Sequence, residues 1–202
     1  MYKHLVINAY PRSGSVYFAS TISLCNIECI LASLHTPYII GNEGIYNLAI
    51  IRNPYDCIAS LSFMRYSHYK AKNIETPFDL DSFISRSVEE YLLYPKYCNK
   101  YFNDEKLFIL DFSEMVSDPI KNAKLALNKF EIDYDKNIAM TAQEVNNIIS
   151  SQPRQESDSP ANGHMPREKS SDRLMIEDIV SNSKHLDIAY EEYQMLLSKI
   201  KS

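Results

Sequence analysis

A short segment near the start of this sequence carries residue types that can hold an anion. Residues 11–15 read Pro-Arg-Ser-Gly-Ser. Arg12 offers a fixed positive charge with a fork of donors, Ser13 and Ser15 offer hydroxyl groups, and Gly14 lets the backbone wrap close to an anion. The GxxxxGK[ST] pattern of a Walker A loop is missing, which argues against an ordinary ATPase or GTPase. Taken alone, the segment can equally be a strand-to-helix turn with a serine cap.

A second segment, residues 52–60, begins with an arginine and ends with a serine eight residues later. Pro54 suits the first turn of a helix, so Ser60 is expected about two turns into that helix. Arg52, at the end of the preceding apolar run, can then reach the same ligand as Ser60. Alone, such an arginine is more often a salt-bridge partner and such a serine an ordinary surface or core residue.

A histidine lies between these two segments, in the run His35-Thr36-Pro37. Histidine suits the removal of a proton from a hydroxyl group because its usual pKa lies near neutrality. The alternative is a strand-end histidine with a structural hydrogen bond, in which case a carboxylate such as Glu43 is the fallback base. The remaining histidines lack a comparable placement: His4, His68, His164 and His185.

The elements that must position these residues are read from the apolar pattern. Compact apolar runs predict buried strands at 3–9, 28–34, 47–51 and 106–112. Helical spacing predicts helices at about 15–27, 55–68, 79–102, 119–130, 139–150 and 173–200, with a kink at Pro95. A polar segment at 151–172, rich in Ser, Pro and Gly, is expected to be a flexible loop.

This alternation of strands and helices predicts a three-layer α/β/α architecture around a mostly parallel sheet. In such sheets ligands bind beyond the carboxyl ends of the strands. The loop at Arg12, the His35 run and the Arg52 segment all follow predicted strands, so we expect them to share one edge. The length of 202 residues suits a single domain spanning 1–202.

The composition limits which kinds of ligand, metal and location are expected for the chain. The formal net charge is −5, so the overall basic footprint of a nucleic-acid-binding protein is missing. The four cysteines form no CxxC pair and have no histidines at zinc spacing, so we expect reduced thiols and no metal site. No signal peptide and no apolar run of ~18–20 residues is apparent, so we expect a cytoplasmic protein without a membrane span. Oligomeric state is left open.

Taken together, the two segments resemble the signature of the sulfotransferase family. PRSGSVY at 11–17 resembles the family's 5′-phosphosulfate loop, which reads PKSGTTW in cytosolic members and often RSGS in bacterial and carbohydrate-acting members. IIRNPYDCIAS at 50–60 resembles the 3′-phosphate motif. LFILDFSEMVSDP at 107–119 resembles the strand that ends in Tyr-Glu-Asp-(Leu/Met) and continues to Asp-Pro. The three occur in family order and cover roughly residues 3–130.

The resemblance implies a P-loop NTPase-like sulfotransferase fold and the sulfate donor 3′-phosphoadenosine 5′-phosphosulfate (PAPS). Arg12 would replace the loop lysine, which contacts the 5′-phosphate and the sulfuryl group. Residues 13–15 would cradle the 5′-phosphosulfate, and Arg52 and Ser60 would hold the 3′-phosphate. Tyr17 falls where cytosolic members carry tryptophan, which implies stacking on adenine.

Two further roles follow from the same resemblance. In many members a late Arg-Lys-Gly loop closes over the 3′-phosphate, which Arg167 and Lys169 would do here, although the glycine after the basic pair is missing. The family's base is the histidine of a Lys-Thr-His-x-Pro run. His35 begins a His-x-Pro run seventeen residues before Arg52, with Ser-Leu in place of Lys-Thr.

The sequence therefore predicts an enzyme that moves a sulfuryl group from PAPS to a hydroxyl acceptor and releases adenosine 3′,5′-bisphosphate, without a metal ion. Carbohydrate, lipid, small alcohol and tyrosyl peptide all remain open as acceptors. Two other functions stay possible: a P-loop kinase of small molecules, and a non-catalytic nucleotide-binding relative on the same fold.

Overall fold

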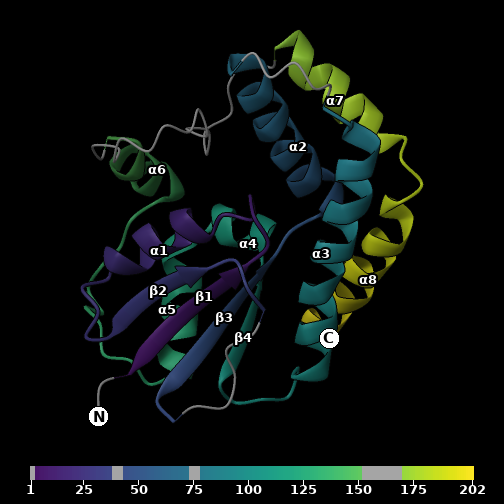
Figure 1. The fold of residues 1–202 in the computed structure, drawn as a ribbon. Coiled ribbons are helices and arrows are strands. Elements are labelled where there is room, and N and C mark those ends of the chain that lie inside the picture. The colour runs from purple at the N-terminus through teal and green to yellow at the C-terminus, as the bar shows by residue number, and fades with distance from the viewer. Residues whose placement is uncertain (1–2, 38–42, 73–77, 152–169) are drawn as a thin grey trace.

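The central sheet has four strands, all parallel, in the order β2-β1-β3-β4. In this computed structural model, residues 3–37, 43–72, 78–151 and 170–202 are described. The strands are β1 (His4–Ala9), β2 (Ile30–Leu34), β3 (Ile45–Ile51) and β4 (Leu107–Asp111). The order places β1 and β3 in the centre, so the loops that follow these two strands lie side by side (Figure 1). The predicted parallel α/β sheet is confirmed.

Helices cover both faces of the sheet, which gives the three expected layers (Figure 1). They are α1 (Ser15–Ser23), α2 (Pro54–Ala71), α3 (Leu80–Lys100), α4 (Phe112–Ser117), α5 (Pro119–Lys129), α6 (Ala142–Ser151), α7 (Ser171–Ser181) and α8 (Leu186–Ile200). Alternate strand residues point to opposite faces. Leu5, Ile7, Leu48 and Ile50 pack with α1 and α5, whereas Ala49 and Ile51 pack with α3 and α8.

A third apolar cluster joins α2 and α3 to α7 and α8 above the sheet. It contains Ile58 and Leu61 of α2, Ile84 of α3, and Ile176 of α7, all of them buried. This packing fixes α2, which starts at the end of β3, relative to the carboxyl edge of the sheet. No helix within the described ranges is long and apolar enough to cross a membrane.

Several boundaries differ from those the sequence predicts. The helix expected at 15–27 ends at Ser23, because the chain turns through Asn26, whose φ is 50°, before β2 begins. The helix expected at 173–200 is two helices, α7 and α8, separated by a turn at 182–185. Helix α3 continues through Pro95 from Leu80 to Lys100. Most of the predicted loop at 151–172 lies outside the described residues.

The fourth strand ends one residue before its predicted end, and a short helix follows. The Asp111 carboxylate accepts a hydrogen bond from the Ser113 backbone N–H at 3.0 Å, so Asp111 is the N-cap of α4. Phe112 consequently belongs to the first turn of α4 rather than to β4. This detail matters because Phe112 then faces the loops at the carboxyl edge.

Candidate functional site

The loop between β1 and α1 has two residues with a positive φ, at positions 12 and 14. Arg12 has a φ of 68° and Gly14, the N-cap of α1, has a φ of 84°. A left-handed conformation costs a residue other than glycine roughly 1–2 kcal/mol. The Ser13 backbone N–H bonds to the Tyr10 carbonyl oxygen at 3.1 Å and closes the turn. The loop therefore presents the N-terminus of α1, where free N–H groups attract anions.

Gly14 is also needed for packing. A Cβ atom added at this position would lie 2.8 Å from Cε2 of Phe112 and 2.8 Å from Cε of Met115. Contacts this short mean that a side chain at position 14 would displace Phe112 or Met115 of α4. The sequence assigned Gly14 to the approach of an anion, and the structure adds the close packing against α4 as a second reason.

The two predicted anion-binding segments meet through their side chains. Nη1 of Arg52 donates a hydrogen bond to the Arg12 carbonyl oxygen at 2.7 Å. Nε of Arg12 in turn donates a hydrogen bond at 3.1 Å to Oγ of Ser60, which lies in the second turn of α2. The sequence grouped Ser60 with Arg52, whereas the structure joins Ser60 to Arg12. The result is a single interlocked unit built from both segments.

Arg52 is held through both its side chain and its backbone. Its Cζ atom lies 4.1 Å from the ring centroid of Phe112, a distance at which a cation is attracted by an aromatic face. The Tyr91 hydroxyl of α3 donates to the Arg52 carbonyl oxygen at 2.8 Å. Nε of Arg52 is buried and has no hydrogen-bond partner among the described residues. Buried donors of this kind are normally satisfied, so Nε is available to an acceptor such as a phosphate oxygen.

Positive charge accumulates in this unit. Burial lowers the pKa of Arg12, and the positive charges of Arg52 and of Arg173 in α7 lower it further. Beside these cations, the Ser13 hydroxyl is buried without a hydrogen-bond partner in the described part of the chain. A cluster of like charges next to an unused hydroxyl donor is relieved by a bound anion. The electrostatics of the edge therefore suit an anionic ligand with more than one charged group.

His35 lies at the same edge, directly after β2. Its Nδ1 atom is 3.0 Å from the carbonyl oxygen of Ala9, the last residue of β1. A carbonyl only accepts, so in this pair Nδ1 carries the hydrogen and Nε2 keeps its lone pair. The side chain is exposed. The fallback base, Glu43, precedes β3 and hence lies at the opposite edge, away from this histidine.

The remaining predicted site residues are placed as follows. Ser15 is buried in the first turn of α1. Tyr17 is only 6% exposed and belongs to the core cluster beneath α1, so its stacking on adenine stays a prediction. Arg167 and Lys169 lie outside the described residues. No cluster of side chains suited to a metal ion occurs in the described ranges.

Sequence reasoning missed the supports of the site. Phe112 and Tyr91 contact Arg52 directly, yet they come from elements 60 and 39 residues away. The buried Asp111 accepts a hydrogen bond from the Tyr193 hydroxyl of α8 at 2.7 Å, and this pair anchors the start of α4. The only sequence signal was the position of Asp111 and Phe112 at the end of a buried strand.

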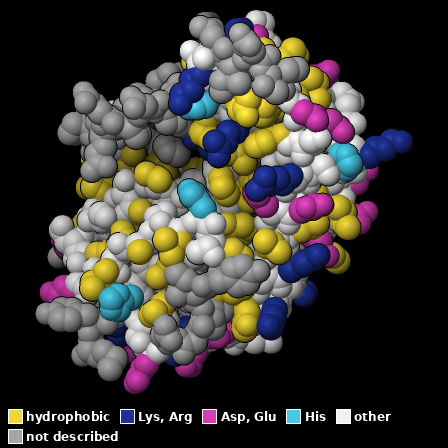
Figure 2. All heavy atoms as spheres, in the orientation of Figure 1, with side chains coloured by type: hydrophobic (Ala, Val, Ile, Leu, Met, Phe, Trp, Pro, Cys, Tyr) yellow, Lys and Arg dark blue, Asp and Glu magenta, His cyan; other side chains and the backbone are white. Residues whose placement is uncertain are grey.

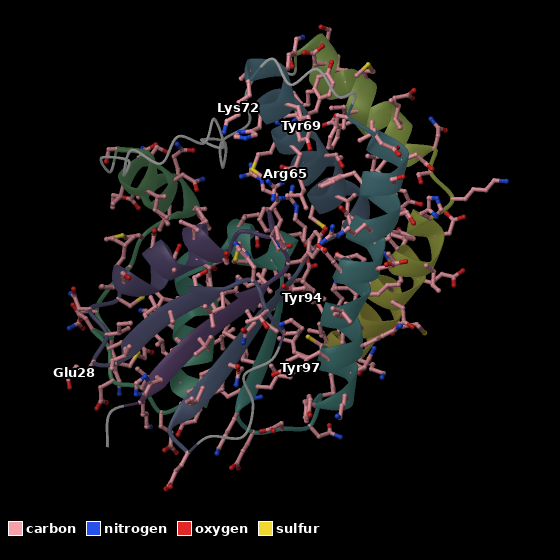
Figure 3. All side chains as sticks on the ribbon, in the orientation of Figure 1. Glu28, Arg65, Tyr69, Lys72, Tyr94 and Tyr97 are labelled. Carbon is pink, nitrogen blue, oxygen red and sulfur yellow. The ribbon has the colours of Figure 1, made fainter. Side chains whose placement is uncertain are left out.

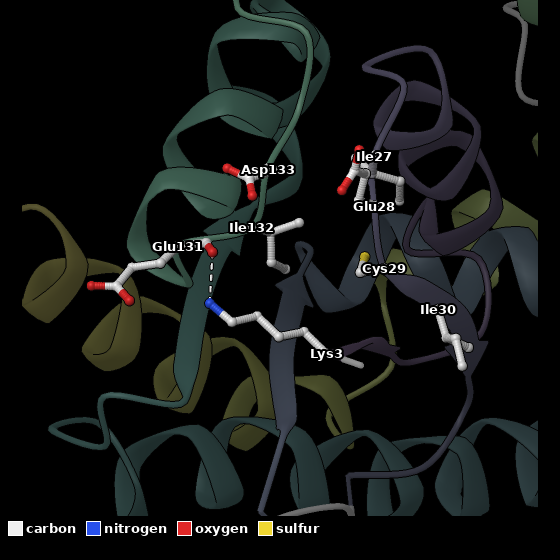
Figure 4. Close-up of a pocket in the computed structure, with 8 residues that line it drawn as sticks. All are labelled: Lys3, Ile27, Glu28, Cys29, Ile30, Glu131, Ile132 and Asp133. Atoms are coloured by element: carbon white, nitrogen blue, oxygen red, sulfur yellow. Dashed lines mark hydrogen bonds between the residues drawn. The ribbon is translucent and has the colours of Figure 1, made fainter. Parts of the chain in front are cut away.

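A pocket at the amino end of the sheet has a different character (Figure 4). It is lined by Lys3, Ile27, Glu28, Cys29, Ile30, Glu131, Ile132 and Asp133. Nζ of Lys3 donates to the carbonyl oxygens of Phe130 at 2.9 Å and Glu131 at 2.6 Å. The charge of this lysine is thus already bound by the protein itself, so the pocket is not a second anion site.

Comparisons with known proteins bear on the fold. Neither a protein-family model nor a curated protein sequence matches the chain. Among solved structures, mouse sulfotransferase SULT7A1 complexed with PAP matches at 13% identity and a TM-score of 0.50, covering 98% of this chain and 88% of that one. The sulfotransferase domain of the Synechococcus PCC 7002 olefin synthase matches at 10% identity and a TM-score of 0.47, covering 90% and 96%. At this identity the likeness concerns the fold alone, and the chain has the fold of the sulfotransferases.

Proposed function

We propose that this protein transfers a sulfuryl group from PAPS to a hydroxyl acceptor. The observation that carries the proposal is the unit formed by Arg12, Arg52 and Ser60, because in it the two predicted anion-binding segments meet at one edge of the sheet. PAPS carries anionic groups at both its 5′ and 3′ positions, which matches two neighbouring holders. A nucleotide with phosphates only on its 5′ side would leave one holder unused.

Different residues of the site would bind the two anionic ends of PAPS. The N-terminus of α1, with Ser13, Gly14 and Ser15, suits the 5′-phosphosulfate because free N–H groups and hydroxyls converge there. Arg52 suits the 3′-phosphate, since its buried Nε lacks an acceptor within the described residues. Arg12 lies between them through its bonds to Arg52 and Ser60. Charge-assisted hydrogen bonds of this kind are the strong ones in binding sites.

The transfer itself is an in-line displacement, analogous to phosphoryl transfer. The acceptor oxygen attacks the sulfur, and the bond from sulfur to the bridging oxygen of the 5′-phosphate breaks. The acceptor proton passes to Nε2 of His35, and the electron pair of the broken bond stays on the phosphate that leaves. Arg12 and the loop N–H groups stabilise that growing negative charge, which is where electrostatic catalysis is largest.

Calorimetric titration tests the donor assignment. Adenosine 3′,5′-bisphosphate is expected to bind at least about tenfold more tightly than ADP, because only the former has a phosphate for Arg52. Arg12→Ala should weaken this binding, whereas Arg86→Ala, an exposed arginine of α3, should leave it unchanged. A clear preference for ADP would instead indicate a P-loop kinase. Transfer of radiolabelled sulfate from PAPS to a panel of hydroxyl compounds then tests turnover.

A further inference from the structure

Helix α2 continues past the proposed donor site with a basic face. Ser60, which contacts Arg12, starts a row in which Met64, His68 and Lys72 follow at intervals of four residues, and this row winds gradually around the helix. Arg65 lies three residues before His68 and seven before Lys72, so these three side chains share one side of the helix. Figure 3 shows Arg65 and Lys72 extending from the side of α2 that looks toward α1 and α6.

Within the described residues, the charges on this face form no ion pair. Lys70, on the side of α2 that contacts α7, forms an ion pair with Asp172 at 2.7 Å. Arg65 and Lys72 are exposed, and neither has a carboxylate partner in the ranges that the structure describes. Figure 2 shows Lys and Arg side chains gathered over α2, with a histidine among them. The chain as a whole is acidic, with a net charge of −5, so this basic face stands out against the rest of its surface.

The face lies at a defined distance from the proposed reaction. At roughly 1.5 Å of rise per residue, Arg65 is about 8 Å and Lys72 about 18 Å along α2 from Ser60. The two cations are thus about 10 Å apart along the helix axis. The donor anions have their own holders in Arg12 and Arg52. A neutral phenol or an apolar alcohol would gain nothing from a second row of cations that extends this far.

We infer that the acceptor is an acidic saccharide chain that lies along α2, with its carboxylates or sulfates on Arg65 and Lys72. The inference rests on the proposed sulfuryl transfer and names the acceptor class of that same site. An acidic saccharide carries hydroxyl groups on each ring beside its anionic groups. In this arrangement one hydroxyl of the chain would be the acceptor that His35 deprotonates, while the anions of neighbouring rings would contact the two cations.

Binding of a fluorescent oligogalacturonate, followed by anisotropy with adenosine 3′,5′-bisphosphate present, tests the inference. The carboxylated chain should bind, with affinity that falls as salt increases, and a neutral maltoheptaose should bind at least about tenfold more weakly. Arg65→Glu and Lys72→Glu should each weaken oligogalacturonate binding about tenfold or more. Arg65→Lys, which keeps the charge, should retain most of it.

The matched control is Lys96→Glu, which reverses one exposed cation on α3 and changes the net charge by the same amount. If Lys96→Glu and Arg65→Glu lower the affinity for oligogalacturonate equally, the effect depends only on net charge and the inference is wrong. So would equal binding of the neutral oligosaccharide, or tighter binding of a glutamate-rich tyrosyl peptide. Thermal unfolding of each variant separates lost contacts from lost folding.

Titration of the same variants with adenosine 3′,5′-bisphosphate keeps the two proposals apart. Arg65→Glu and Lys72→Glu should leave this affinity within about threefold of the parent, since the donor holders are intact. If the parent protein fails to bind the bisphosphate, the proposed function is wrong. If it binds the bisphosphate but shows no preference for the acidic saccharide, only the acceptor assignment is wrong.

Discussion

The two ends of the sheet treat positive charge in opposite ways. At the amino end, Lys3 donates to the carbonyl oxygens of Phe130 and Glu131, so its charge is bound within the fold. At the carboxyl end, Arg52 keeps a buried Nε without an acceptor among the described residues, and Arg12 is crowded by like charge. At the carboxyl end the protein accepts hydrogen bonds from only part of the Arg52 guanidinium, and its buried Nε has no acceptor among the described residues. A donor left over in this way suits an anion that comes from outside.

The strongest way to sharpen this contrast is to remove the proposed base. His35→Gln is expected to lower turnover by roughly 10²–10⁴-fold, because the side chain can no longer take the acceptor proton. The affinity for adenosine 3′,5′-bisphosphate should stay unchanged, since His35 bonds to the Ala9 carbonyl oxygen rather than to Arg12 or Arg52. Radiolabel transfer and calorimetry measure the two quantities. His185→Gln, an exposed histidine before α8, is the control, and undiminished turnover in His35→Gln would exclude His35 as the base.

The next largest effect concerns the second anion holder. Arg52→Ala should weaken binding of adenosine 3′,5′-bisphosphate by about tenfold or more, the worth of one or more charge-assisted hydrogen bonds. Binding of 5′-AMP, which lacks the 3′-phosphate, should change much less. Calorimetry with both nucleotides isolates the contribution of the 3′-phosphate. Equal losses for the two nucleotides would place Arg52 at the 5′ end or give it a purely structural role.

A smaller effect is expected for the aromatic ring beneath Arg52. Phe112→Leu removes an interaction worth about 0.5–2 kcal/mol, so the affinity for adenosine 3′,5′-bisphosphate should fall severalfold. Phe112→Tyr keeps the ring and should retain the affinity. Met115→Leu is the matched control, because Met115 packs on the same Gly14 without a ring for Arg52. An equal loss in Met115→Leu would trace the effect to packing of the loop.

The smallest functional effect belongs to the amino end of the sheet. Lys3→Met removes two hydrogen bonds to carbonyl oxygens and should lower the free energy of unfolding by about 1–3 kcal/mol. The nucleotide affinity of the folded protein should not change. Urea denaturation and calorimetry measure these separately. Weaker nucleotide binding by Lys3→Met would mean that the cation at the amino end of the sheet is not purely structural.

The arrangement of the strands and the shared edge could be predicted from the sequence. Apolar runs such as 47–51 indicate strands buried on both faces, and parallel strands end at one edge, which brings Arg12, His35 and Arg52 together. Their partners could not be predicted. The contact of Phe112 with Arg52 depends on where β4 stops, and the capping carboxylate of Asp111 decides that.

The spacing of apolar residues also gave a wrong prediction near the end of the chain, where one helix was expected and two are present. The apolar spacing at 173–200 continues smoothly enough to suggest one helix, yet the chain turns at 182–185. Helix α7 packs in the cluster with α2 and α3, and α8 packs both in that cluster and against β3 and α3. Tyr17 is buried in the core cluster beneath α1, and its predicted contact with adenine stays a prediction.

The hydrogen bond from Tyr193 to Asp111 spans 82 positions of the chain. During translation α5, α6 and α7 therefore emerge from the ribosome before Tyr193 can donate its hydrogen bond to Asp111. A nascent chain that stops before Tyr193 would bury an acid without this donor. The complete support of the proposed nucleotide site should consequently form late, well after the four strands have been synthesised.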